Sequence, residues 1–128
     1  MIVADTSYLV EGLLRDASLL QEETLSPELA FYEVANMVWK HEFILRDLKN
    51  SWRYLEVFLQ LVSEGKVLLV TPDKEILQEA HELSGRYRTS VYDTVFVALA
   101  LDLGLELKTF DNAQTRIFSK ETGQRTTR

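Results

Sequence analysis

Residues 90–113, SVYDTVFVALALDLGLELKTFDNA, contain an almost unbroken apolar run with an aspartate near each end, Asp93 and Asp111. The spacing of the apolar residues predicts a helix that ends at Gly104, followed by a short strand, LELKT. Aspartate is seldom buried, because an unpaired charge in an apolar environment is costly. The two aspartates are therefore either ordinary cap and turn residues or members of one site.

Short apolar strands alternate with amphipathic helices along the rest of the chain. A helix is expected to begin with Ser26 as its N-cap and Pro27 as its first residue, the usual chemistry of a helix start. The predicted strands are IVA (2–4), the weak candidate QEETL (21–25), KVLLV (66–70) and LELKT (105–109). This alternation predicts a layered α/β domain with a mostly parallel sheet.

The length and composition indicate one folded domain. With 128 residues, of which 46% are hydrophobic, the chain is long enough to bury a core and is not disordered. We expect a single domain over residues 1–128, with a polar, flexible tail from about 119 to 128. The sequence has no cysteine, no basic region typical of a signal peptide and no apolar run of the ~18 residues that span a membrane. These features predict a cytoplasmic protein without a membrane segment.

The net charge of -6 argues against tight, nonspecific binding of nucleic acid, which depends on Lys and Arg side chains that neutralise phosphates. An acidic protein still binds RNA when metal ions and a local basic patch supply the positive charge. Arg86 and Arg88 precede Asp93 and are candidates for contacts to an RNA phosphate. The alternative for this segment is an ordinary solvated loop.

Two carboxylates directly follow predicted strands. Asp5 follows IVA and Asp111 follows LELKTF, and ligands of parallel sheets bind at the carboxyl ends of the strands. Each aspartate also has an ordinary interpretation, as a helix cap for Asp5 and a turn residue for Asp111. Asp93 fits a capping box with Ser90. Asp73 follows a strand too, and an acid in the first turn of a helix is its simpler explanation.

Glu33 has no such explanation, because it lies well inside a predicted helix. No Lys or Arg lies three or four positions away, and Asn36 is its only polar neighbour at that spacing. A carboxylate on a largely apolar face needs a partner from elsewhere in the fold. Glu33 is therefore a candidate for a site shared with the aspartates.

A site that contains Asp5, Glu33, Asp93 and Asp111 concentrates four negative charges. Their repulsion raises the pKa values of the carboxyl groups unless a cation neutralises them. Oxygen ligands without His or Cys favour Mg²⁺ or Mn²⁺. Carboxylates that hold such ions are suited to phosphoryl chemistry, in which the metal activates a water molecule and stabilises charge on the phosphate.

The order and spacing of four blocks resemble the PIN-domain family, and within it the VapC-like prokaryotic group. The blocks are IVADTS (2–7), FYEVAN (31–36), YDTVFVALALDLG (92–104) and LKTFD (107–111). The family usually has Ala after the third acid, where this chain has Thr94, and some members carry a further charged residue where this chain has Asn112.

The resemblance implies a three-layer α/β/α, Rossmann-like PIN domain and a metal-dependent endoribonuclease, usually the toxin of a toxin–antitoxin pair. It implies that Asp5, Glu33, Asp93 and Asp111 form the catalytic, metal-binding site, with Mg²⁺ or Mn²⁺ as the cofactor. It also implies that a hydroxyl of Thr6 or Ser7 supports Asp5, and that an RNA substrate, an antitoxin and a homodimer partner are expected. Trp39 and Trp52 belong to a surplus of aromatic residues that serves either the core or such an interface.

Three other functions compete with a toxin nuclease. The first alternative is a nuclease of the same kind that acts in RNA processing without an antitoxin. The second is an inactive domain that serves only as a scaffold for binding. A receiver-like phosphoacceptor domain also combines an α/β sheet with acids and Mg²⁺. It needs paired acids after its first strand, whereas Thr6 and Ser7 follow Asp5 here. The complete acidic set favours the metal-dependent ribonuclease.

Overall fold

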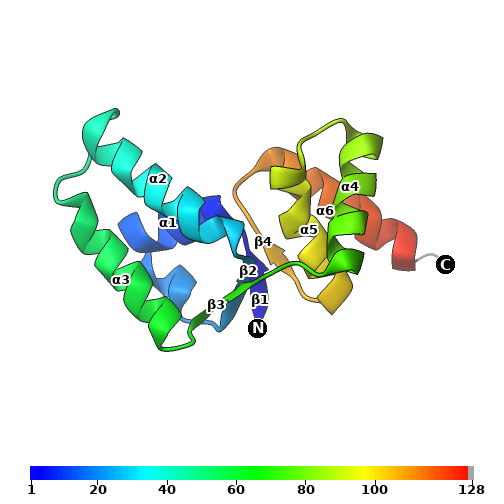
Figure 1. Cartoon of the computed structure of the whole chain (residues 1–128), viewed down its shortest axis with the longest axis horizontal. Helices are drawn as coiled ribbons and strands as arrows, with labels where there is room; N and C mark the ends of the chain where they lie inside the picture. Colours follow the sequence, from blue (N-terminus) through cyan, green and yellow to red (C-terminus); the bar gives the residue numbers. More distant parts are fainter. Residues whose placement is uncertain (127–128) are drawn as a thin grey trace.

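Helices and short strands follow one another along residues 1–126, the part of the chain that the computed structural model describes (Figure 1). The elements are β1 (Ile2–Ala4), α1 (Thr6–Leu14), the 3-10 helix η1 (Ala17–Leu20), β2 (Thr24–Pro27), α2 (Leu29–Phe43), α3 (Ser51–Ser63), β3 (Val67–Val70), α4 (Lys74–Tyr87), α5 (Val91–Leu103), β4 (Leu107–Lys108) and α6 (Asn112–Thr126). Positions 127 and 128 lie outside the described residues.

The strands form one four-stranded sheet in the order β3-β2-β1-β4, and every pair of neighbours is parallel. Val3 of β1 is in register with Leu25 of β2 on one side and with Leu107 of β4 on the other. The chain leaves β1 toward β2 and later returns to the opposite edge as β4. The strand order therefore reverses beside β1, which is where ligands bind in open parallel sheets.

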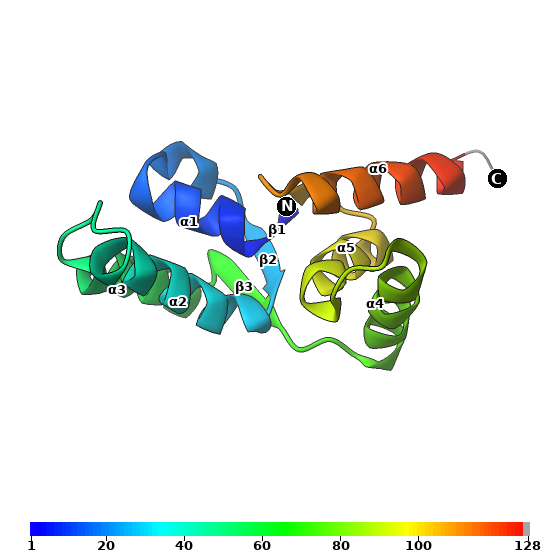
Figure 2. The same cartoon turned by 90° about the horizontal axis from the view of Figure 1, so that it is seen from above.

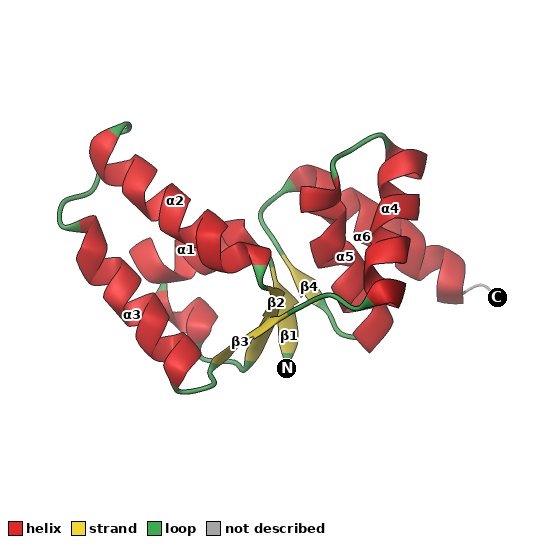
Figure 3. Cartoon of the chain, viewed as in Figure 1, coloured by secondary structure: helices red, strands yellow, loops and turns green. Residues whose placement is uncertain are grey.

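Helices cover both faces of the sheet, which gives three layers (Figures 2 and 3). Helices α1, α2 and α3 form one layer, and α4, α5 and α6 form the other (Figure 1). This is the predicted α/β/α architecture with a parallel sheet. Among the described residues, no helix is both long enough and apolar enough to cross a membrane.

Helix α5 is the central helix of its layer. Every residue from Thr94 to Ala100 is buried, because α5 contacts the sheet as well as α4 and α6. A helix that is apolar on all sides is typical of such a position. The hydroxyl of Thr94 is satisfied there, since it donates a hydrogen bond of 2.7 Å to the backbone carbonyl of Ala80. The departure from the usual Ala of the family is thus accommodated.

The predicted start of the second helix was wrong. Ser26 and Pro27 are the last residues of β2, and the helix begins at Leu29. Ser26 pairs with Leu69 of β3, and its hydroxyl donates to the carbonyl of Ala4 at 2.7 Å. Pro27 is accommodated because it closes the strand. Pairing with strands distant in the sequence outweighed a local helix signal.

The C-terminal segment also differs from the prediction. Residues 119–126, expected to belong to a polar tail, continue α6 to Thr126. Glu121 is only 4% exposed and forms a salt bridge of 2.9 Å with Arg86, and the hydroxyl of Tyr87 donates to it at 2.6 Å. These contacts hold a segment of polar composition on α4. Positions 127 and 128 of the predicted tail lie outside the described residues.

Candidate active site

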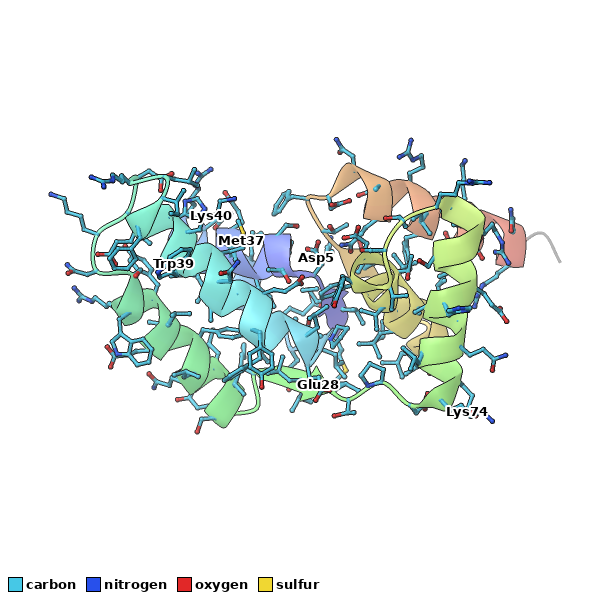
Figure 4. All side chains as sticks on the ribbon, turned by 45° about the horizontal axis from the view of Figure 1, so that its top comes forward. Asp5, Glu28, Met37, Trp39, Lys40 and Lys74 are labelled. Atoms are coloured by element: carbon cyan, nitrogen blue, oxygen red, sulfur yellow. The ribbon has the colours of Figure 1, made fainter. Side chains whose placement is uncertain are left out.

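A cavity of about 650 Å³ opens where β1 and β4 end. Asp5 lies between the two helical layers at this point (Figure 4). The structure brings together in this cavity the four carboxylates predicted from the sequence, two that follow β1 and β4 and two on α2 and α5: Asp5, Asp111, Glu33 and Asp93. The acids that bound the apolar run 90–113 thus line one cavity.

Asp5 is the most deeply placed of the four, with 2% of its surface exposed. It is the N-cap of α1, and its Oδ1 accepts hydrogen bonds from the backbone N–H of Tyr8 at 3.0 Å and from the hydroxyl of Ser7 at 2.7 Å. Its Oδ2 accepts from the hydroxyl of Thr109 at 2.7 Å. The two interpretations of Asp5 therefore hold together, because the residue caps a helix and also lines the cavity.

Asp111 likewise caps a helix and lines the cavity. Its Oδ1 accepts from the backbone N–H of Gln114 at 2.9 Å, as a cap of α6, and its own N–H donates to the hydroxyl of Thr109 at 2.9 Å. Ser7 joins the two strand ends, since its hydroxyl accepts from the N–H of Phe110 at 2.9 Å while it donates to Asp5. This network fixes the segments that carry Asp5 and Asp111 relative to each other.

Glu33 projects from the middle of α2 into the cavity. The hydroxyl of Thr6 donates to its Oε1 at 2.7 Å. The resemblance to the PIN-domain family implied that Thr6 or Ser7 supports Asp5. In the structure Ser7 bonds to Asp5, whereas Thr6 bonds to Glu33. The partner that Glu33 required from another element is therefore the first residue of α1.

Asp93 does not form the capping box of its ordinary interpretation. Ser90 is the N-cap of α5, but its side chain makes no capping hydrogen bond. Instead the carboxylate of Asp93 accepts from the hydroxyl of Thr89 at 3.0 Å and from that of Ser90 at 3.5 Å. The side chain is thus held by hydroxyl groups at the edge of the cavity.

The electrostatics of the cavity follow from its composition, because no Lys, Arg or His of the described chain lines it. Burial raises the pKa of Asp5, and the charge of Asp111 adds to this effect, although hydrogen bonds from Ser7, Thr109 and Tyr8 oppose it. Burial likewise raises the pKa of Glu33, with further contributions from Asp93 and Asp5. A cation in this cavity offsets both burial and repulsion.

The donor atoms of the cavity fit a hard divalent cation, since all of them are oxygens. Gln114, which is 3% exposed, also lines the cavity, and its Oε1 has no hydrogen-bond partner within residues 1–126. A buried amide oxygen without a partner is uncommon and has the chemistry of a ligand for such an ion or its water. As placed, no three acidic or histidine side chains of residues 1–126 form a ready-made metal-binding group.

The remaining candidates lie outside this cavity. Asp73 is the N-cap of α4, and its carboxylate accepts from the N–H of Ile76 at 2.9 Å. Arg86 pairs with Glu121 and lines a separate hollow between α4 and α6. Arg88, the C-cap of α4, lies with Thr89 in another hollow. The structure therefore gives Arg86 a structural contact and leaves Arg88 available.

Sequence reasoning did not single out several polar residues of the site. Thr109 bonds to Asp5 and Asp111, Thr89 bonds to Asp93, and Gln114 lines the floor of the cavity. Thr109 and Thr89 each lie within four positions of a predicted acid, so a hydroxyl near a candidate carboxylate was a usable signal. For Gln114 the sequence carries no such signal.

Comparisons with known proteins agree with this arrangement. Residues 2–118 match the PIN domain family. The chain is also similar to Ribonuclease VapC3 from Pyrobaculum aerophilum, with 36% identity over 90 residues, which is 70% of this chain and 67% of that protein. The parallel sheet, the cavity at its switch point and these matches lead to one conclusion: the chain belongs to the PIN-domain family and is VapC-like.

Proposed function

We propose that this protein is a Mg²⁺- or Mn²⁺-dependent endoribonuclease that hydrolyses phosphodiester bonds of RNA. The observation that carries the proposal is the convergence of the four predicted carboxylates, with Glu11 as a fifth acid in the lining, in a cavity that no Lys, Arg or His of residues 1–126 lines. The ribonuclease name of the similar Pyrobaculum protein supports RNA as the substrate. We further propose that the protein is the cytoplasmic toxin of a VapBC-type pair and that a cognate antitoxin controls it.

Asp5, Glu33, Asp93 and Asp111 hold the metal ion or ions in this proposal. When bound, such an ion supplies positive charge that stabilises the phosphate in the transition state and lowers the pKa of a water molecule. The two raised carboxyl pKa values support the assignment, because a site that is unfavourable when empty of cations gains most from binding one.

The other residues of the site position these ligands. Ser7 and Thr109 fix Asp5 from both of its oxygens, Thr6 fixes Glu33, and Thr89 fixes Asp93. Hydrogen bonds of this kind hold a ligand in one rotamer and preserve its orientation. The network therefore fixes the orientation of the individual carboxylates at the end of the sheet.

Direct attack by water fits the cavity better than a covalent intermediate. The chain has no cysteine. The hydroxyls of Ser7 and Thr6 donate to carboxylates and are thereby occupied in holding ligands. The attack forms a bond between the water oxygen and phosphorus, and the bond from phosphorus to the 3′-oxygen breaks. The products are a 5′-phosphate and a 3′-hydroxyl.

Metal dependence is the first test of the proposal. We expect purified protein to cleave single-stranded RNA in Mg²⁺ or Mn²⁺, to be silent in EDTA, and to recover when Mn²⁺ is added in excess. Gel analysis of end-labelled RNA, with phosphatase treatment of the products, reports both the rate and the 5′-phosphate. Undiminished cleavage in EDTA rejects the metal mechanism, and RNA binding without cleavage under any metal favours an inactive scaffold.

Assembly is the second test. Phe58 is buried, whereas Trp39 is 46% exposed, Trp52 is 61% exposed and Tyr32 is 72% exposed, so α2 and α3 present aromatic side chains to solvent. Exposed aromatic groups favour a protein interface, and we propose that they serve a homodimer.

The antitoxin is proposed to place a basic side chain near the acidic cavity, where its positive charge complements the negative charge of the carboxylates. Multi-angle light scattering should give a dimer mass, and a monomer at micromolar concentration, both free and with the antitoxin, contradicts the proposal.

A further inference from the structure

Three cationic side chains line a hollow of about 420 Å³ between the end of α4 and α6. These are Arg88, Arg116 and Lys120, all exposed, and we call this place the basic hollow. Within residues 1–126 none of the three forms a salt bridge, although Lys120 lies 5.9 Å from the ring centre of Tyr87. In a chain with a net charge of -6, this is a local concentration of uncompensated positive charge.

The fold does not favour these residues for its own stability. Arg88 has φ 52° and ψ 49°, a left-handed conformation in which helices usually end with Gly. Arg116 and Lys120 are four positions apart on α6, and like charges at this spacing repel each other. An anion that binds between the three side chains compensates for the repulsion. Arg86, the penultimate residue of α4, is already paired with Glu121 and is not part of the hollow.

The basic hollow borders the acidic cavity at two places. Thr89 lines the hollow and donates to the carboxylate of Asp93 at 3.0 Å. Ala113 lines it as well, two residues after Asp111. When the scissile phosphate of an RNA strand lies among the carboxylates, no cationic side chain of the described chain faces it inside the acidic cavity. The neighbouring phosphates of the RNA need positive charge on the surface next to this cavity, and the basic hollow supplies that charge.

We propose that the basic hollow binds backbone phosphates of the RNA strand that is cleaved in the acidic cavity. The inference rests on the proposed ribonuclease function and adds the direction in which the substrate leaves the site, across the N-terminal ends of α5 and α6. Contacts of Lys and Arg with phosphates fix the register of a strand without reading its sequence. The hollow therefore contributes affinity and positioning, and base preference originates elsewhere.

The test measures how RNA binding depends on salt. Binding of a fluorescent single-stranded RNA is followed by anisotropy in Mg²⁺, with every protein in an Asp93→Asn background to suppress cleavage. The test variant carries Arg88→Gly, Arg116→Ala and Lys120→Ala. Each phosphate contact on a single strand contributes about 0.7 to the slope of log K against log salt. We expect the triple variant to lower the slope by about 2 and to weaken binding at least about tenfold at moderate salt.

The control variant removes three other exposed cations, by Lys40→Ala, Lys49→Ala and Lys74→Ala, and has the same net charge. Lys40 and Lys74 lie in different helical layers, on α2 and α4 (Figure 4). The control should keep the slope of the Asp93→Asn background. Equal slopes for the test variant and this background, or equal losses in both triple variants, overturn the inference.

The three substitutions of the test variant are not expected to destabilise the fold, so a change in RNA binding does not result from unfolding. Gly suits the left-handed position of residue 88, and the two Ala substitutions remove a like-charge pair, so the melting temperature of the test variant should equal or exceed that of its background. If wild-type protein neither binds nor cleaves RNA, the proposed function fails and the inference fails with it. If wild type cleaves RNA but the slope is unchanged in the test variant, only the inference fails.

Discussion

Replacing Asp5 with Asn should reduce metal-dependent cleavage of RNA by at least about 100-fold, the lower end of what a lost catalytic contact costs. Asn caps a helix as well as Asp does, so α1 retains its first hydrogen bond from Tyr8. The hydroxyl of Thr109 both donates and accepts, and it can turn toward the new amide. The fold is therefore expected to survive while one negative charge leaves the metal site. Initial rates at saturating Mn²⁺, with circular dichroism of both proteins, measure the effect.

Asp73→Asn is the matched control. Asp73 also follows a strand and caps a helix, accepting from Ile76 at 2.9 Å, but it does not line the acidic cavity. Its variant should cleave RNA at close to the wild-type rate. Comparable losses in both variants would mean that the effect of Asp5→Asn comes from changing a helix-cap carboxylate to an amide in general, and the assignment of Asp5 as a metal ligand would be wrong.

The core of the site was predictable because two general rules point to it. Asp5 and Asp111 follow strands, and a parallel sheet gathers the ends of its strands at one edge. Glu33 stood out because its helix offers no cation at the spacing of one turn. These rules depend on position along the chain alone, so they hold without knowledge of side-chain orientation. Asp5, Asp111 and Glu33 could therefore be placed before any contact was known, whereas Asp93 was assigned to the site by the resemblance to the PIN-domain family.

The errors have a different origin. Ser26 and Pro27 carry a helix-start signal, but they pair with β3, and such pairing between distant segments is invisible locally. The proposed RNA contacts of Arg86 and Arg88 stay predictions, but the sequence did not show that helix α4 directs Arg86 toward Glu121 on α6. The roles of Thr6 and Ser7 could not be separated either, since adjacent residues at a helix start point to different elements. Pairing between distant segments and the direction of individual side chains could not be predicted from the sequence.

The stability of the Asp93→Asn variant distinguishes two roles of Asp93, that of a metal ligand and that of a negative charge that only stabilises the start of α5. At the start of α5 a negative charge is favourable by about 0.3–1 kcal/mol. Against this, the charge of Asp93 contributes to the raised pKa of Glu33, after the larger effect of burial. Without metal we therefore expect the variant to be as stable as wild type or more stable. Because a raised carboxyl pKa lowers stability only at pH values where the group is ionised, the gain should be present at neutral pH and disappear as the pH falls below the ordinary value of 4.5.

Metal reverses the order of the two proteins. An ion at 100 times its dissociation constant stabilises the folded state by about 2.7 kcal/mol. Loss of one ligand that weakens binding 10- to 100-fold removes about 1.3–2.3 kcal/mol of this gain. Wild type should thus show a clear rise in melting temperature with Mn²⁺ while Asp93→Asn shows little, and cleavage should disappear with the shift. Equal shifts with cleavage intact would leave Asp93 as a residue that only stabilises the start of α5. The measurement is decisive because the hydroxyls of Thr89 and Ser90 can still donate to the amide oxygen of Asn, so the local structure is retained in both proteins.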